Sequence, residues 1–597
     1  MGSQYDRTPL VDSTGNLGGR GRNSPIVPDI HYVRHEESAS SPEENADVPR
    51  LCSDSCNDAH ITLEPVEDQV LVSLPSLFPL EHSLVDSAVL PRSYSCLNQI
   101  LPYLQNIMSP SLAYHLFEIS LQEQTTSLLQ SSSPFILTQV FRPSSILHPT
   151  SPRQLKPALL STMLWCVAHT AEESNFRGIP GGRRQVCEAL YTLSVKLIRP
   201  ADPDEWSRAP VLNDQDREPG VGSAMRPWGP PGDVDDVLAL LILAIVVSGG
   251  DFKSDCLKWL DKACRLAIVL KLDQEDGDSH STGVCFQQTP DIATVERKEE
   301  RRRLFWLLFS IDRHLALSFN STVHIRDGTY YVFQPLPEFV WASLEDNLER
   351  ACTNRQLGPP TTISGFGFYE YFLPLMTVLG DIIDIHHRRC HPRLGKIDDR
   401  ASITAAENMI ISCEQSLAAL QGQTPRGYVS DQPVSQCELL LHVLHVLLHG
   451  NWDPISMLEE SGDWISSESF LKCASHAVSA SEALSRVLNL DPELTFMPYL
   501  LGIYLLHGSF ILLLFADRMP QLGPNKSVKD ACEIIIRAHE ICVTTLNTEF
   551  QRRFRKVLRS ALQRARAPGV SGLGYTAQRW DLLSLYRWAH GGKGLAV

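Results

Sequence analysis

Four side chains in one stretch of the chain could hold a metal ion. A glutamate and three histidines fall on one face of a predicted helix at i, i+4, i+7 and i+11: Glu438, His442, His445 and His449. Carboxylate and imidazole groups bind zinc, but zinc hydrolases place the glutamate between two histidines as H-E-x-x-H, and that order is absent here. We therefore favour a solvent-facing polar stripe or a buried hydrogen-bond network. A helical metalloenzyme that uses these four residues is the alternative.

Other catalytic signatures are missing from the sequence. It contains no G-x-S-x-G elbow, no G-x-x-x-x-G-K-[ST] phosphate loop and no complete G-x-G-x-x-G turn. His387 and His391 lie one helical turn apart, but the neighbouring arginines would repel a cation, and Pro392 ends the helix. We therefore predict that the protein is not an enzyme, and we expect no metal and no cofactor in this chain.

The elements that position these side chains are predicted helices, and the clearest covers residues 296–317. A charged start passes directly into a helix that is apolar on nearly every face, so the helix should be buried. Asp312 and Arg313 then become buried charges, each of which costs several kcal/mol unless it is paired. We predict that each has a fixed partner on a neighbouring helix.

This helix resembles the central signature of the regulatory domain of fungal binuclear zinc cluster transcription factors, the pattern E-E-R-R-R-L-F-W…D-R. The signature positions here are Arg301, Arg302, Arg303, Trp306, Asp312 and Arg313. Further strings are similar to the xylanolytic activator branch of that family: GNWDPI at 450–455, DWISS at 463–467, SHAVSA at 475–480 and FMPY at 496–499. The resemblance extends from about residue 90 to the C-terminus.

The resemblance implies an all-α fold, with one large multi-helical regulatory domain after a disordered leader. It implies a nuclear transcription regulator similar to xylanolytic or arabinolytic activators, which controls carbohydrate-utilisation genes in response to a sugar-derived inducer. The partners it implies are the transcriptional machinery, other transcription factors of the family and promoter DNA, with no membrane. In that case the signature charges are structural, and inducer binding biases the protein between arrangements of its helices.

The family reads DNA through six cysteines that hold two zinc ions, and this sequence offers no positions for that cluster. Its early cysteines are Cys52 and Cys56, spaced C-x3-C among acidic residues, and two thiolates cannot complete a tetrahedral site. No DNA-binding residue is assigned. Either the protein regulates through partner transcription factors without reading DNA itself, or an upstream coding segment is missing from the sequence.

Composition divides the chain into four predicted parts. Residues 1–60 are poor in aromatic residues and should form a disordered leader. Residues 61–90 mix acidic and apolar residues around prolines, which is typical of an activation segment or of a strap packed on the main domain. Residues 91–520 form the regulatory domain, and 521–597 a helical extension. A net charge of −16 restricts any DNA contact to a local patch, and the 15 scattered cysteines indicate reduced thiols.

One apolar segment raises the question of a membrane helix. Residues 497–515 contain no Asp, Glu, Lys or Arg over 19 positions, just enough to span a bilayer. Pro498, Gly502 and His507 interrupt the segment, and its flanks carry no excess of lysine and arginine. We therefore predict a buried core helix and localisation to the nucleus.

A basic helix is predicted near the C-terminus. It has an apolar stripe and no acidic residue between positions 551 and 567, and its first basic residues are Arg552, Arg553, Arg555, Lys556 and Arg559. It could serve as a nuclear import signal, contact phosphates or dock an acidic partner. Alternatively, its arginines pair with acidic residues of the same protein.

Overall fold

A computed structural model describes the protein over a series of residue ranges separated by gaps. They are 94–121, 140–205, 232–248, 254–275, 291–353, 355–389, 398–423, 431–453, 464–492, 502–509 and 526–546, with a few single positions besides. All of them belong to one compact unit. The predicted leader, the segment 61–90 and both early cysteines lie outside these residues.

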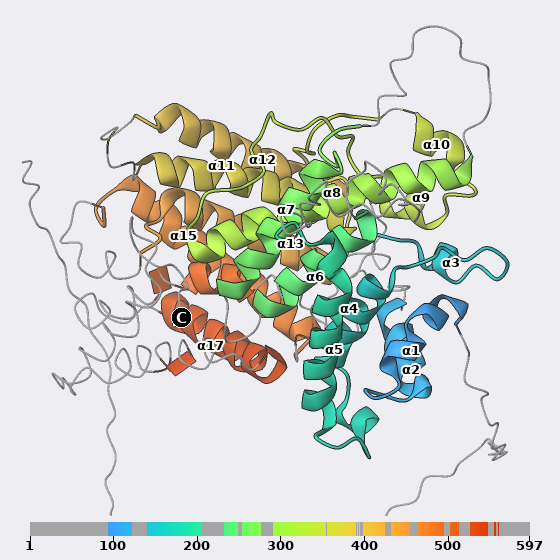
Figure 1. The fold of residues 1–597 in the computed structure, drawn as a ribbon. Coiled ribbons are helices and arrows are strands. Elements are labelled where there is room, and N and C mark those ends of the chain that lie inside the picture. The colour runs from blue at the N-terminus through green and yellow to red at the C-terminus, as the bar shows by residue number, and fades with distance from the viewer. Residues whose placement is uncertain are drawn as a thin grey trace, which may run out of the picture. The chain divides into compact units, whose positions relative to one another are not determined.

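The described residues are mostly helical, so the predicted all-α fold is confirmed (Figure 1). The helices up to the signature are α1 (Leu101–Leu104), α2 (Pro110–Leu121), α3 (Pro143–Ile146), α4 (Pro157–Ala168), α5 (Gly182–Ile198), α6 (Val234–Ser248) and α7 (Ser254–Val269). The signature helix and those after it are α8 (Ile292–Phe319), α9 (Glu338–Ala342), α10 (Leu348–Cys352), α11 (Leu373–Arg389), α12 (Arg400–Gln423), α13 (Asp431–His449), α15 (Glu468–Leu490) and α17 (Lys526–Leu546).

Short elements connect these helices. Three 3₁₀ turns cover Ser95–Gln99, Glu173–Phe176 and Arg199–Ala201, and a π-helical turn, Phe368–Phe372, leads into α11. Extended pairing within the described part of the chain is limited to two isolated β bridges, Gln274 with Tyr331 and Phe333 with Leu357.

Helix α8 connects two groups of helices. In the group before it, α4 packs against α2, α5 and α6, and α6 packs against α7. In the group after it, α11 packs against α12 and α13, α13 against α15, and α15 against α17. Helix α8 contacts α6 and α7 from the first group and α11 from the second, so it packs against both groups.

The sequence of α8 explains its burial and its end. Every residue from Arg303 to Ser318 is buried, because apolar side chains occupy nearly all faces of this part of the helix. The helix ends at Asn320, which adopts the left-handed conformation at a φ of 50° and donates its N–H back to the carbonyls of the last turn. Asparagine tolerates this conformation better than most residues, so the chain can turn back along the helix.

The apolar segment 497–515 is described only over residues 502–509 and at positions 511 and 512. Residues 502–509 are helical, and the Tyr504 side chain is fully buried, with its hydroxyl 3.2 Å from the sulfur of Met376 on α11. These residues therefore lie in the core, in agreement with the predicted core helix. No helix among the described residues has the length and apolar character needed to cross a bilayer.

Candidate functional site

The candidate site is a network of charged side chains on α8, which we call the charge network. Its α8 members are Glu296, Glu299, Glu300, Arg301, Arg302, Arg303, Asp312 and Arg313. The side chains of Glu299, Arg303, Asp312 and Arg313 have no exposed surface. A buried charge that loses its partner is strongly destabilising. The partners of these residues therefore fix how other segments lie on α8.

Arg303 connects α8 to α9 and to the turn before α11. Its guanidinium donates to the Leu336 carbonyl at 2.8 Å and to the Glu338 carboxylate at 3.1 Å. Its planar face lies 4.9 Å from the ring centre of Trp341. The hydroxyl of Tyr369 donates to the Arg303 carbonyl at 2.7 Å. Arg303 thus holds three segments that follow α8 in the sequence.

Glu299 and Arg302 hold the extended segment 331–336 and the end of the α7 region. Glu299 accepts the N–H of Leu336 and a bond from Arg355 at 3.0 Å. Arg302 forms a bidentate pair with Glu275 at 2.7 and 2.8 Å, and the N–H of Phe333 donates to the same carboxylate at 2.9 Å. Burial alone would raise the pKa of Glu275, but its bonds to Arg302 and Phe333 hold that pKa below its ordinary value.

Arg153 connects α8 to α6 and to the segment before α4. It donates to Glu300 and to Asp235, in each case at 2.7 Å, and Asp235 also accepts the N–H of Lys156 at 2.8 Å. Burial raises the pKa of Glu300 to about 7, although the charge of Arg153 opposes that change. One arginine therefore serves two buried carboxylates from different helices.

Arg142 makes a second connection of the same kind. It pairs with Glu296 of α8 at 3.0 Å and with Glu345, which follows α9, at 2.7 Å. The side chain of Arg142 is buried, and its guanidinium lies 5.6 Å from the ring centre of Trp341. Two arginines from before α4 therefore dock on the acidic side chains of α8.

Asp312 and Arg313 are paired, but their partners do not lie where we predicted them. Asp312 accepts the backbone N–H groups of His324 and Ile325, each at 2.9 Å, and the His324 ring at 2.7 Å. Arg313 lies 3.2 Å from the ring centre of Phe309 and pairs with Asp327 at 3.3 Å. The prediction of partners on a neighbouring helix was wrong.

The reason is the turn at Asn320. Because the chain folds back along α8 there, the N–H groups of the following loop face the helix and need acceptors. The buried carboxylate of Asp312 supplies them. The hydrogen bond to Asp312 also raises the pKa of His324.

The two remaining signature residues, Arg301 and Trp306, both donate hydrogen bonds to backbone carbonyls. Arg301 donates to the carbonyls of Leu270 and Lys271 at the end of α7, at 3.1 and 3.0 Å. The Trp306 indole N–H donates to the Phe333 carbonyl at 2.7 Å. All six signature positions thus contact segments that pack around α8.

The predicted polar stripe on α13 is part of a partly buried network, which we call the histidine network. The Nδ1 atoms of His442 and His476 are 3.1 Å apart, and the rings of His445 and His476 stack with centres 3.9 Å apart. His445 lies 3.3 Å from Glu414 of α12, and His449 lies 3.6 Å from Glu407 of α12. The remaining member of the stripe, Glu438, pairs with Arg486 of α15.

This arrangement favours the network over a stripe facing solvent, because His445 and His449 are both buried. Burial lowers the pKa of His449 and of His476 to about 4, so both rings are neutral at pH 7. Within the described ranges, no cluster of three or more His, Cys, Asp or Glu side chains is arranged to bind a metal ion.

The predicted basic helix lies largely outside the described residues, including Arg552 and Arg553. Positions 555, 556 and 559 are helical, and Arg559 pairs with Glu540 of α17. For Arg559, this pair supports the alternative in which the basic residues pair with acidic residues of the same protein.

Sequence reasoning missed the partners of the charge network, namely Arg142, Arg153, Lys156, Asp235, Glu275, Glu338 and Arg355. One signal was available for Asp235 and Asp236, because both stand in the first turn of an otherwise apolar helix. Two acidic residues that enter the core at the start of such a helix require cationic partners.

Comparison with known proteins agrees with the family resemblance seen in the sequence. Residues 225–366, which include α6, α7 and α8, match the fungal-specific transcription factor domain. The xylanolytic transcriptional activator of Aspergillus clavatus is 34% identical over 95% of this chain and 67% of its own length. The activators of Aspergillus niger and Emericella nidulans are 36% and 37% identical over 84% of this chain, which covers 62% and 64% of their lengths. The chain thus spans about two thirds of these relatives, and no solved structure matches it.

Proposed function

The chain belongs to the family of fungal-specific transcription factors that includes the xylanolytic activators, and on this premise we propose that it controls carbohydrate-utilisation genes in response to a sugar-derived inducer. The observation that carries the proposal is the similarity to xylanolytic activators at 34% identity over 95% of the chain. We further propose that the protein acts in the nucleus, together with promoter DNA and the transcriptional machinery.

The charge network supports a regulatory role for this part of the protein. Its ion pairs connect α8 to α6, to α9 and to the segments before α4 and after α7. A shift of any of these segments separates buried charges, so small distortions are costly, and we expect any rearrangement of the helices to occur in discrete steps. An inducer that binds one arrangement more tightly than another shifts the population between them.

A transcript measurement tests the proposal. The gene is deleted in its host, and transcripts of xylan- and arabinan-degrading enzymes are measured after transfer from glucose to xylan or arabinan. We expect the deletion to abolish the rise of these transcripts and the intact gene to restore it. Transcripts that rise equally in the presence and absence of the gene would contradict the proposal.

A variant sharpens this test. The gene carrying Arg303→Met should restore the response poorly, because the Arg303 guanidinium pairs with Glu338 of α9 and lies 5.2 Å from the ring centre of Tyr369 in the turn before α11. Arg184→Met is the matched control, since Arg184 is exposed on α5 and its ion pair within the described part of the chain is with Glu188 of the same helix. Protein levels are measured in both strains, so that lost regulation is distinguished from lost protein.

A further inference from the structure

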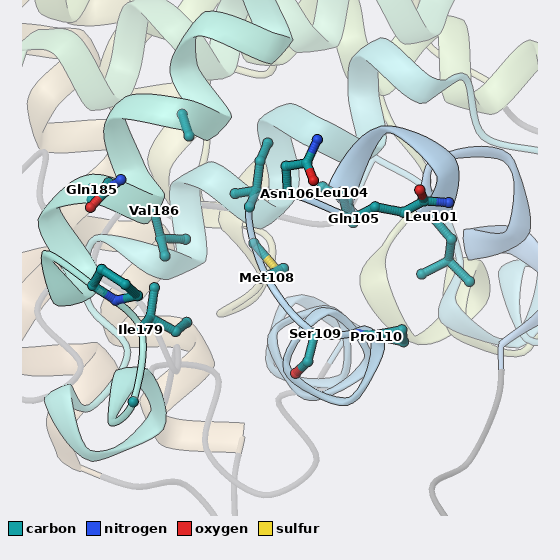
Figure 2. Close-up of a pocket in the computed structure, with 14 residues that line it drawn as sticks. Leu101, Leu104, Gln105, Asn106, Met108, Ser109, Pro110, Ile179, Gln185 and Val186 are labelled. Carbon is teal, nitrogen blue, oxygen red and sulfur yellow. The ribbon is translucent and has the colours of Figure 1, made fainter.

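A cavity of about 510 Å³ lies between the start of α5 and the segment that joins α1 to α2. Figure 2 shows Gln185 and Val186 on the α5 side, Leu101 and Leu104 on the α1 side, and Met108 between them. Cavities of roughly 300–1,000 Å³ are typical of small-molecule sites. Neither the charge network nor the histidine network takes part in this cavity.

The lining carries no charge. None of its 14 residues is Asp, Glu, Lys, Arg or His, although charged residues make up 20% of the chain. A charged ligand would find no group of opposite charge in this lining. The lining therefore selects uncharged molecules.

Three amide side chains lie around the cavity with free hydrogen-bonding capacity. Gln105, Asn106 and Gln185 line it with exposed amides, and none of the three makes a side-chain hydrogen bond to another described residue. Each amide offers two N–H donors and a carbonyl acceptor, which suits ligand hydroxyl groups, since these both donate and accept. Ser109 uses its oxygen to accept the N–H of Leu112 at 3.3 Å and keeps its own hydrogen for donation.

The apolar part of the lining is largely buried. Leu104, Met108 and Val186 are 1%, 6% and 1% exposed and leave a ligand almost no surface. The apolar surface beside the exposed amides therefore comes from the partly buried Leu101, Ile107 and Ile179. Carbon-bound hydrogens of a ring can pack on this surface while hydroxyl groups reach the amides. A molecule with both kinds of surface matches the cavity.

We propose that this cavity binds an uncharged, hydroxyl-rich small molecule of monosaccharide or disaccharide size, and that the sugar-derived inducer acts here. The assignment of the inducer to this cavity rests on the proposed function, whereas the binding of a hydroxyl-rich molecule does not. Helix α5 packs against α4 and α6, and α6 carries Asp235 of the charge network. Packed helices, α5 and then α6, therefore connect the cavity to α8.

Calorimetric titration of the purified full chain tests binding. The probes are the neutral sugars D-xylose, D-glucose, xylobiose and cellobiose, and the charged analogues D-glucuronate and D-glucose 6-phosphate. We expect at least one neutral sugar to bind with a stoichiometry of one and the charged analogues to bind much more weakly. Absence of binding by every neutral sugar, or equal binding of the charged analogues, would overturn the proposal.

Variants locate the bound sugar. Gln185→Met removes one amide with little change in size and should weaken binding about three- to tenfold. Ala189→Trp places a large ring in the cavity and should abolish binding, since Ala189 lines it. The matched controls are Gln415→Met and Ala418→Trp on the exposed face of α12, which contributes nothing to the cavity. Melting temperatures verify that each variant is folded, and controls that weaken binding as much as the cavity variants overturn the assignment.

The transcript assay separates the two parts of the proposal. If a strain carrying Ala189→Trp still responds to the sugar, the cavity is not the inducer site, while the proposed function stands. If the sugar binds in the cavity but gene deletion leaves transcripts unchanged, the proposed function fails, while the binding site stands. Loss of both binding and response in the Ala189→Trp strain, with both retained in Ala418→Trp, supports both.

Discussion

Arg303 of the charge network contacts several of the segments around α8. It bonds to a backbone carbonyl and to Glu338, lies against Trp341, and neighbours the buried Glu299 at 3.4 Å. These contacts need a planar, permanently charged group, so lysine could not replace it. Removal of Arg303 leaves the carboxylates of Glu299 and Glu338 with one cation fewer.

We therefore predict that Arg303→Met lowers the free energy of unfolding by about 3–5 kcal/mol, the range for breaking a buried ion pair. Urea denaturation followed by circular dichroism measures the change. The control Arg184→Met should change stability by about 0.5 kcal/mol or less, because its pair with Glu188 is exposed. Equal effects of the two substitutions would show that the buried ion pair contributes no more to the free energy of unfolding than the exposed one.

Helices α12, α13 and α15 share the histidine network. The rings of His442, His449 and His476 have lowered pKa values because of burial, to about 4 for His449 and His476. The charged groups around them are Glu407 and Glu414 of α12, Glu438 of α13, Lys472 and Arg486 of α15, and Arg389 of α11. Protonation of one ring would place a charge beside two other imidazoles.

The sign of the pH dependence follows from these directions. Between the ordinary histidine pKa of 6.5 and about 4, the unfolded chain binds more protons at His449 and His476 than the folded protein does. Their contribution to stability is therefore complete above pH 6.5 and is lost as the pH falls through this range. Glu407 and Glu414 have lowered pKa values, so they begin to lose their contribution only near and below their ordinary value of 4.5.

We predict that the protein is less stable at pH 5.0 than at pH 7.5, and that His476→Gln reduces this difference. Urea denaturation of both proteins at the two pH values measures it. His115→Gln, which changes an exposed histidine of α2, should leave the difference as it is in the wild type. A pH effect that is the same in His476→Gln and the wild type would contradict the role of this network.

Two helical glycines test how closely α8 and α11 pack. A Cβ atom added to Gly380 of α11 would lie 3.0 Å from Nε of Arg313, which is buried and stacked on Phe309. At Gly422 of α12, an added Cβ would meet nothing within 4 Å. The same substitution therefore meets a crowded site in one helix and open space in the other.

We predict that Gly380→Ala lowers the free energy of unfolding by about 1 kcal/mol, because Arg313 cannot move aside without cost. Gly422→Ala should raise it by about 0.5 kcal/mol, because alanine favours the helix. Thermal and urea denaturation of both variants give the comparison. A gain in stability at Gly380 would show that α8 and α11 can separate freely.

At the scale of the whole molecule, α8 should be among the last elements to open. Its residues 303–318 are buried on every face, whereas α12 is buried only along one stripe. We predict that backbone amides of 303–318 exchange with deuterium about tenfold or more slowly than those of α12. Hydrogen exchange read by mass spectrometry compares peptides of both helices in one sample. Faster exchange in 303–318 would contradict the central position of α8.

The sequence predicts the parts of this molecule that depend on local pattern. Helical periodicity predicts the buried helix 296–317 and, with it, the buried charge of Asp312, and the resemblance predicts the family and its all-α fold. The partners could not be predicted in the same way. Arg153 meets Glu300 across 147 positions and Arg355 meets Glu299 across 56, and no periodicity connects residues so far apart.

The cavity beside α5 escaped prediction for a related reason. Nothing in the sequence distinguishes Gln105 and Gln185 from other glutamines. Only the packing of two segments that are distant in the sequence places them around one cavity. The loop at His324 and Ile325 was missed because backbone N–H groups leave no trace in residue types. Chemistry carried by the backbone is therefore the least accessible to sequence reasoning.

The bridging of two carboxylates by Arg153 has an evolutionary consequence. A simple ion pair can be inverted by exchanging its two residues, but Arg153 pairs with Glu300 on α8 and with Asp235 on α6 at the same time. A reversal at any one of the three sites leaves like charges together in the core, and a second reversal still leaves at least one like-charge pair. No path of single tolerated steps leads through such intermediates, so we expect these three positions to show strong epistasis and to be inherited as a unit.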